Sequence, residues 1–130
     1  MPLLTILDEN ASGSILHRLE LEINQEMLTV RELIARRVHD EAAAYNERQS
    51  GVFQGLVQPT ESEKVLNGYR LRPQKLIDAE QQVYRALEAF QRNGFFVLVN
   101  DRQVDSLDEE VWLGSGATAS FLKLTPLVGG

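Results

Sequence analysis

Residues 15–23 alternate between apolar and polar side chains, and this alternation restricts the fold more than any other stretch of the chain. One face carries apolar residues and one histidine: Ile15, His17, Leu19, Leu21 and Ile23. Because successive side chains of a strand point to opposite faces, a period of two predicts a half-buried strand. An apolar run at residues 3–7 precedes it, and turn-forming residues 8–13 separate the two. We therefore expect an antiparallel hairpin over residues 3–23.

A helix is predicted after the hairpin. Thr29 and Glu32 have the three-residue spacing of a capping box, a hydrogen-bonded pair that begins many helices. Apolar residues then follow at helical spacing: Val30, Leu33, Ile34, Val38, Ala42 and Tyr45. The spacing predicts an amphipathic helix over about residues 30–45, with Asn46 as its end. Such a helix must bury its apolar stripe, so we expect it to cross the sheet that the hairpin begins.

The segment of about residues 47–94 interrupts this simple order. Two further capping pairs follow in it: Thr60 with Glu63, and Asp78 with Gln81. The first pair predicts a short helix that Asn67-Gly68 ends, and the second predicts a longer helix that Asn93-Gly94 ends. We interpret the segment as a mainly helical insert that either covers additional sheet or forms a surface for a partner.

The remaining stretches predict strands. Residues 95–99 are apolar throughout, as in a central strand that is covered on both faces. Residues 111–113 form a short strand or a packed turn, in which Trp112 is expected to pack against the end of the sheet. Residues 118–125 are predicted to be the closing strand. We expect a single α+β domain over residues 1–130, with a mixed sheet, one crossing helix and the helical insertion.

The composition narrows the possible partners. The 130 residues carry a net charge of −6 without a basic block, which argues against nucleic acid and anionic membranes. The absence of cysteine excludes disulfides, thiolate metal sites and a cysteine nucleophile. The first residues soon reach Asp8 and Glu9, so no signal peptide is expected, and no apolar run is long enough to span a membrane. We expect a cytoplasmic protein.

The sequence ends in a short tail that follows the apolar run at residues 119–125: Pro126, Leu127, Val128, Gly129 and Gly130. Since glycine makes up about 7% of ordinary proteins, a final pair of glycines arises by chance in roughly one chain in 200. A folded strand followed by a flexible carboxylate suggests a tail that another protein grips and activates. A frayed end of small residues explains the same composition, and the tail alone does not decide between the two.

Three segments of the C-terminal part resemble the β-grasp family, which includes ubiquitin and its prokaryotic relatives. They are Leu98-Val99-Asn100, Leu113 to Thr118, and Phe121 to Gly130. In these segments the chain is similar to prokaryotic ubiquitin-like modifiers and to the sulfur carriers of molybdopterin and thiamine synthesis. The resemblance implies a β-grasp fold, whose first and last strands pair in parallel at the centre of the sheet. The chain departs from the family in its insert and in the turn Gly114-Ser115-Gly116, which lacks acidic residues.

The resemblance also implies how the tail reacts. A carboxylate is a poor electrophile, and in this family an adenylating enzyme of the ubiquitin-activating type activates it with ATP. Gly130 would form an acyl-adenylate, and a thiolate or persulfide of the partner would then take the acyl group. Gly129 and Gly130 suit a narrow channel because they lack Cβ atoms, Pro126 restricts the tail, and Leu127 and Val128 anchor it. The chain would be a substrate without a bound cofactor, and its downstream partner an acceptor protein or a sulfur-accepting enzyme.

Two alternatives stay open beside the modifier. In the first, the tail carboxylate becomes a thiocarboxylate and the chain is a sulfur carrier. In the second, the sheet and the insert bind another protein without any conjugation. An enzyme is expected least, because no nucleophile motif, metal cluster or acid–base pair is found. We therefore assign no catalytic and no metal-binding residues.

The histidines and the acidic clusters have simple structural interpretations. His17 is expected to be a sheet-edge residue with a satisfied hydrogen bond. The cluster of His39, Asp40 and Glu41 is expected to lie on the helix surface, since a metal site needs converging ligands. The run Asp108-Glu109-Glu110 is expected to be a solvated loop, because a calcium site needs more oxygen ligands at a set spacing.

Overall fold

The computed structural model describes residues 3–48, 52–59, 62–65, 68–71 and 76–124. The chain forms two compact units. The first, called the sheet unit below, consists of residues 1–32 and 90–130, and the second, called the inserted unit, consists of residues 33–89. The predicted insert therefore overlaps the second unit.

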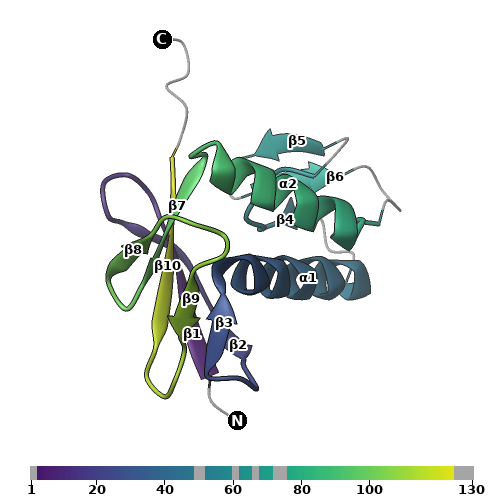
Figure 1. Ribbon diagram of the computed structural model, residues 1–130. Helices are drawn as coiled ribbons and strands as arrows, with labels where there is room; N and C mark the ends of the chain where they lie inside the picture. The colour runs from purple at the N-terminus through teal and green to yellow at the C-terminus, as the bar shows by residue number, and fades with distance from the viewer. Residues whose placement is uncertain (1–2, 49–51, 60–61, 66–67, 72–75, 125–130) are drawn as a thin grey trace. The chain divides into compact units, whose positions relative to one another are not determined.

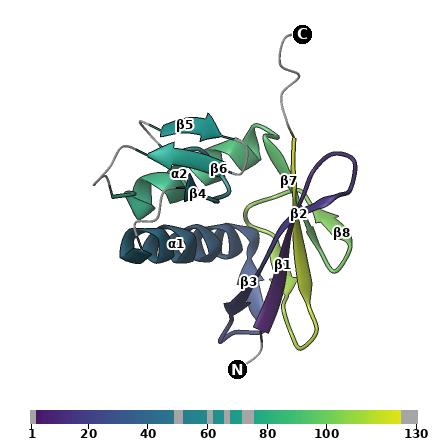
Figure 2. The same cartoon turned by 180° about the vertical axis from the view of Figure 1, so that it is seen from behind.

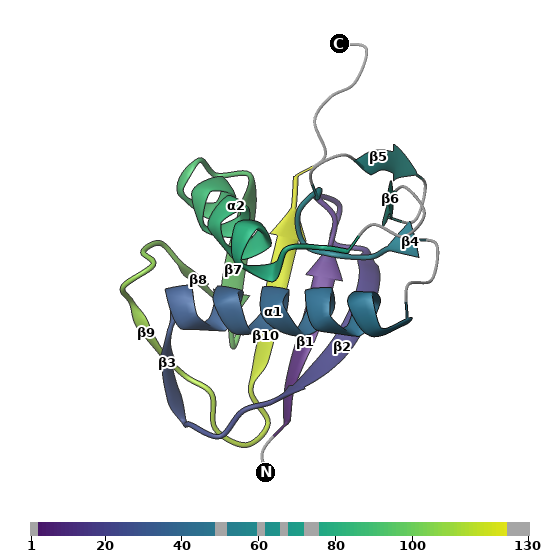
Figure 3. The same cartoon turned by 90° about the vertical axis from the view of Figure 1, so that its right-hand side faces the viewer.

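The sheet unit contains a five-stranded mixed sheet with the order β2-β1-β10-β7-β8. Its strands are β1 (Leu3–Glu9), β2 (Ile15–Glu22), β7 (Phe95–Val99), β8 (Arg102–Val104) and β10 (Thr118–Lys123). Figure 1 shows β10 in yellow as the last of these strands, and Figure 3 shows β7, β10, β1 and β2 side by side. The expected α+β class and the expected hairpin of β1 and β2 are confirmed.

The first and last strands of the sheet are parallel neighbours. Thr5 pairs with Thr118 at one end of the register, and Glu9 pairs with Leu122 at the other. The other neighbouring pairs of strands, β1 with β2, β10 with β7 and β7 with β8, are antiparallel. The parallel pairing that the family resemblance implies is thus present, and it places β10 at the centre of the sheet.

Side chains of the sheet alternate between a buried face and a half-exposed face. On the buried face lie Leu4, Ile6, Val97, Ala119 and Phe121. On the opposite face Leu7, Leu98 and Leu122 are only half-buried. The expectation that residues 95–99 are covered on both faces is therefore wrong: an apolar run here marks one covered face and one partly open face.

A second, two-stranded sheet joins β3 (Met27–Thr29) to β9 (Glu110–Trp112). The strand at residues 111–113 was one of two predicted outcomes and is confirmed, whereas strand β3 was not predicted. Backbone carbonyls of the loop before β9 accept hydrogen bonds from the first N–H groups of the helix that follows β3. Val30 N–H donates to the Glu109 carbonyl at 2.9 Å, and Arg31 N–H donates to the Leu107 carbonyl at 3.0 Å. These bonds satisfy N–H groups that have no partner within a helix.

Helix α1 (Val30–Arg48) begins at the predicted capping box. Thr29 N–H donates to Glu32 Oε1 at 2.9 Å, and Glu32 N–H donates to Thr29 Oγ1 at 3.1 Å. The apolar stripe predicted for this helix is buried throughout: Val30, Leu33, Ile34, Val38, Ala42 and Tyr45. The prediction that Asn46 ends the helix is wrong, since α1 continues to Arg48.

The inserted unit combines most of α1 with a three-stranded antiparallel sheet and helix α2 (Ala79–Gln91). The strands are β4 (Val52–Phe53), β5 (Ser62–Val65) and β6 (Gly68–Leu71), in the order β4-β6-β5, and they are visible in Figure 2. The predicted capping of α2 is confirmed by the bond from Gln81 N–H to Asp78 Oδ1 at 3.2 Å.

The short helix predicted behind Thr60 is wrong, because β5 occupies Ser62–Val65. Val65 pairs with Gly68, so two residues separate β5 from β6. Gly68, which was predicted to end this helix, is instead the first residue of β6. Thr60 and Asn67 themselves lie outside the described residues.

A small aromatic core lies within the inserted unit. It consists of Ala42, Tyr45, Phe53, Leu71 and Ile77. The rings of Tyr45 and Phe53 meet edge to face, with centroids 5.5 Å apart, a favoured geometry for aromatic pairs. The inserted segment is therefore a folded unit with its own apolar centre.

Candidate functional site

The tail residues that the sequence singles out lie outside the described part of the chain: Pro126, Leu127, Val128, Gly129 and Gly130. The described residues end at Leu124, directly after β10. The site can therefore be described from the strand that carries the tail and from the residues that hold this strand.

Strand β10 is held from both sides along its length. Its residues pair with β1 and with β7, up to the pairing of Lys123 with Phe95. Phe121 is fully buried, and its ring lies 6.0 Å from that of Phe95. Pairing with two strands and the burial of Phe121 therefore fix the position of β10 up to its last residues.

A buried carboxylate lies beside the last residue of β10. Asp8 of β1 is 1% exposed, and its Oδ2 lies 3.6 Å from Lys123 Nζ and 3.8 Å from His17 Nδ1. A buried charge costs free energy unless it is paired, and the ammonium group of Lys123 is a counter-charge close to Asp8. The contact with Lys123 ties the end of β10 to β1. His17 lies on edge strand β2 as predicted, but the satisfied hydrogen bond expected for it is absent at Nδ1 within the described residues.

Asn100 links three strands at the opposite end of β10. Its N–H donates to the Thr118 carbonyl at 2.9 Å, and its Oδ1 accepts from the Thr118 N–H at 3.1 Å. Its Nδ2 also donates to the Trp112 carbonyl at 3.4 Å. Asn100 has a positive φ of 49°, a conformation that asparagine tolerates better than most residues. In the sequence Asn100 is singled out only by the family resemblance, and its role in holding β10 was not predicted.

The prediction that Trp112 packs against the end of the sheet is wrong. Its side chain is 52% exposed, and its register partner Met27 is 47% exposed. Strand β9 alternates, so Val111 takes the buried position and Trp112 the open one. Met27 and Trp112 are thus two neighbouring apolar side chains that lie exposed at the surface of the sheet unit.

The inserted unit contains a buried ion pair. Arg37 is fully buried, and its guanidinium donates to Glu41 Oε2 at 2.9 Å and 3.1 Å. Glu41 Oε1 accepts from the Leu56 N–H at 3.3 Å. Burial raises the pKa of Tyr69, and the negative charge of Glu41 adds to this rise. The expectation that Glu41 lies on the helix surface is wrong, whereas Asp40 is half-exposed and pairs with Arg36.

Within the described residues, no three histidine, aspartate or glutamate side chains converge to form a metal site. Neither α1 nor α2 is long and apolar enough to cross a membrane. The acidic run at residues 108–110 is not a simple solvated loop, because Glu110 is the first residue of β9 and Glu109 pairs with Arg102 at 2.7 Å.

Comparisons with protein-family models, with curated proteins and with solved structures find no match to this chain. Its function therefore has to be inferred from its own residues and geometry.

Proposed function

We propose that the sheet unit is a β-grasp domain, and that the chain is a ubiquitin-like modifier or carrier activated at the carboxylate of Gly130. The observation that carries the proposal is the parallel pairing of β1 with β10. A hairpin, a helix start and a last strand inserted beside the first are the order that the family resemblance implies. That order makes the strand before the tail a central one.

The described end of β10 supports this role. Lys123 contacts buried Asp8, and Phe121 lies in the buried face, so the strand is anchored up to the residue before Leu124. An activating enzyme that grips a tail gains when the tail has a fixed starting point, because less freedom is then lost on binding. Glycines at the reacting end let the extended backbone pass where a Cβ atom would not fit.

The proposed chemistry takes place at a partner enzyme. A carboxylate oxygen of Gly130 attacks the α-phosphorus of ATP, the bond to the β-phosphate oxygen breaks, and pyrophosphate leaves. A partner thiolate then attacks the acyl carbon, and AMP leaves with the electron pair of the broken bond. Transfer to an acceptor amine makes the chain a modifier. In this proposal the chain is a substrate and supplies no catalytic group.

The test is ATP–pyrophosphate exchange with adenylating enzymes of the ubiquitin-activating type from the same host. The intact chain should support exchange. Deletion of Gly129 and Gly130, or addition of one alanine behind Gly130, should abolish it, because neither variant presents the same carboxylate. The intact mass of the native protein checks that Gly130 is its last residue. Absence of exchange with the intact chain, or equal exchange with the deletion, contradicts the proposal.

A sulfur carrier is the close alternative. The outer sulfur of a partner persulfide attacks the acyl carbon of the same adenylate and AMP leaves. A second thiol of the partner then breaks the sulfur–sulfur bond, which leaves a thiocarboxylate on the chain and a disulfide on the partner. Mass spectrometry of the protein from its own host separates the two. A carrier gains the mass difference between one sulfur and one oxygen at its C-terminus, whereas a modifier appears in larger covalent adducts. Both products should vanish when the two glycines are deleted.

A non-conjugated interaction module is the second alternative, and the exposed pair Met27 and Trp112 favours it. Large exposed apolar side chains that lie together often mark a surface where another protein binds. A module of this kind keeps its function when Gly129 and Gly130 are deleted. That result, together with an unmodified C-terminus in the host, would replace the modifier by the module.

A further inference from the structure

The two-stranded sheet of β3 and β9 has one buried and one exposed face. Leu28 and Val111 are buried, whereas their neighbours Met27 and Trp112 are open to solvent. Met27 and Trp112 are direct register partners, so their side chains lie next to one another on the same face. This places a flexible thioether beside an indole, a combination that is enriched where proteins bind each other.

The indole of Trp112 is held in place by its surroundings. A Cβ atom added to Gly114 would overlap the indole ring, so the ring lies directly against the Gly114 backbone. The peptide group that joins Trp112 to Leu113 is also fixed at both of its polar atoms: the Leu113 N–H donates to the Glu26 carbonyl at 2.6 Å, and the Trp112 carbonyl accepts from Asn100 Nδ2. A ring that is already positioned loses little conformational freedom when a partner binds.

The acidic residues near Met27 and Trp112 differ in whether they have a cationic partner. In the acidic run before Trp112, Asp108 lies 3.7 Å from Arg31, and Glu109 lies 2.7 Å from Arg102. Glu110 is exposed and has no cationic partner among the described residues. It is two residues from Trp112 on β9, so both side chains lie on the same face of the strand.

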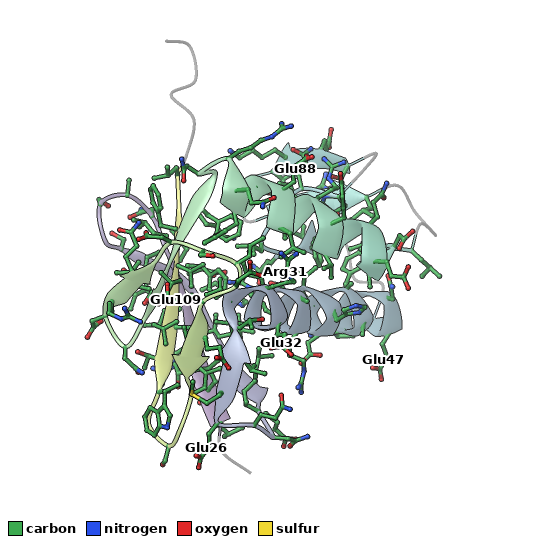
Figure 4. The ribbon with its side chains drawn as sticks, in the orientation of Figure 1. Glu26, Arg31, Glu32, Glu47, Glu88 and Glu109 are labelled. Carbon is green, nitrogen blue, oxygen red and sulfur yellow. The ribbon has the colours of Figure 1, made fainter. Side chains whose placement is uncertain are left out.

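A further carboxylate lies close to this face. Glu26 directly precedes Met27, and Figure 4 shows its side chain at the end of β3. It too is exposed and has no cationic partner in the described part of the chain. The indole of Trp112, the thioether of Met27 and the unpaired carboxylate of Glu110 therefore lie on one face, and the unpaired carboxylate of Glu26 directly precedes Met27 on the chain.

We propose that Met27, Trp112 and Glu110 form a docking surface for a basic segment of a partner protein. An arginine of the partner stacks on the Trp112 indole and pairs with Glu110, while an apolar side chain beside it covers Met27. Residues two apart on a strand are separated by about 7 Å, and a stacked cation lies within about 6 Å of the ring centroid. One guanidinium can therefore contact both groups, and its planar shape suits stacking as well as carboxylate pairing.

The negative charge of this surface favours a basic protein segment over other binding partners. A purely apolar partner would bury Glu110 without a counter-ion, which is costly. Nucleic acid and anionic lipid would be repelled by Glu26 and Glu110. A second copy of the chain would bring the same carboxylates face to face, since the symmetric contact is made by the same surface on both copies.

The test uses the full chain and the emission of Trp112, the only tryptophan in the sequence. The probe is a short acetylated and amidated peptide that alternates leucine and arginine, and the control probe carries glutamate in place of arginine. The leucine–arginine peptide should change the emission saturably, and more weakly at high salt. The leucine–glutamate peptide should not. The indole N–H signal in a two-dimensional NMR spectrum gives a second readout for weak binding.

Three variants separate this surface from general acidity. Glu110→Gln and Met27→Ala should each weaken binding of the leucine–arginine peptide by about threefold to tenfold, as expected for one exposed ion pair or one apolar contact. Glu47→Gln removes the same charge from an exposed position near the end of α1, labelled in Figure 4, and should leave binding unchanged. Urea unfolding of each variant confirms that it is folded.

Several outcomes would overturn the docking surface. These are no saturable change with the arginine peptide, equal binding of the glutamate peptide, or equal weakening by Glu47→Gln. An emission that shifts with protein concentration alone would assign the surface to a second copy, and a shift with neutral lipid vesicles would assign it to a membrane.

Discussion

The side chain of Asn46 forms two hydrogen bonds with the backbone of Ile77, which lies 31 residues further along the chain. Its Nδ2 donates to the Ile77 carbonyl at 2.9 Å, and its Oδ1 accepts from the Ile77 N–H at 2.8 Å. One amide thus connects the last turns of α1 to the segment that leads into α2. The Asn46 amide therefore pairs with both backbone polar groups of Ile77, and the Ile77 side chain lies in the core of the inserted unit.

Replacement of Asn46 by alanine should therefore destabilise the inserted unit. We expect the free energy of unfolding to fall by about 2–3 kcal/mol, because one donor and one acceptor of the Ile77 backbone lose their partner. Urea unfolding followed by circular dichroism measures the change. Asn24→Ala, at an exposed asparagine, should cost less than about 0.5 kcal/mol. Equal losses in the two variants would show that the paired hydrogen bonds do not stabilise the unit.

Two neighbouring ion pairs of α1 should differ in their contribution to stability. Glu41→Gln removes the negative charge that lies 2.9 Å from the fully buried Arg37, and we expect a loss of about 3 kcal/mol. Asp40→Asn removes the half-exposed partner of Arg36 and should cost less than about 1 kcal/mol. Both changes remove one negative charge from the same helix, so net charge does not explain a difference. Similar unfolding midpoints in urea would contradict this ranking.

The capping box predicts a defined dependence of stability on pH. Hydrogen bonds from the backbone and the hydroxyl of Thr29 hold the pKa of Glu32 below its ordinary value of 4.5. The folded state therefore favours the ionised form, and the stabilisation is complete above the unfolded pKa and disappears as the pH falls through the lower folded pKa. Glu32→Gln should be less stable than the original chain at pH 7, and the difference should vanish in acid. A difference that stays constant over this range would rule out the titration of Glu32 as its cause.

The contact between Trp112 and Gly114 predicts a spectroscopic change. Gly114→Ala places a methyl group where the indole lies, so the ring must move and its emission should shift towards that of a fully hydrated tryptophan. Gly116→Ala is the matched control. Gly116 has a φ of 82° and open space around its Cα, so the substitution costs about 1–2 kcal/mol of backbone strain without touching the indole. Fluorescence of the two folded variants decides, and an unchanged emission in Gly114→Ala would contradict the close contact.

Local patterns in the sequence were sufficient to predict several helices and strands. The hairpin of β1 and β2 follows from alternation and a turn, and the start of α1 follows from the spacing of Thr29 and Glu32. In both cases the interacting residues are close along the chain, so their side-chain pattern contains the information. The parallel pairing of β1 with β10 was expected from a family resemblance and not from periodicity.

Contacts between distant residues were not predictable in this way. Asn46 looks like a helix end because asparagine is common there, and only the folded inserted unit brings it to Ile77. The Asp8–Lys123 contact needs strands from the two ends of the chain to lie together. Trp112 was predicted to pack against the end of the sheet, but strand alternation turns its side chain outward. The capping-box spacing of Thr60 and Glu63 was misleading, because Glu63 pairs with Arg70 as part of β5 and β6.

The pairing of residues 5–9 with residues 118–122 also has a consequence for biosynthesis. A ribosome makes the chain from its N-terminus, and β1 emerges long before the strand that it needs on its inner side. During translation β1 has only the β2 hairpin as a neighbour, and its other edge stays open until β10 is released. Contacts of such long sequence separation slow folding and expose a strand edge to aggregation. Completion of the sheet must therefore wait until β10 has been synthesised, and β1 keeps one open edge until then.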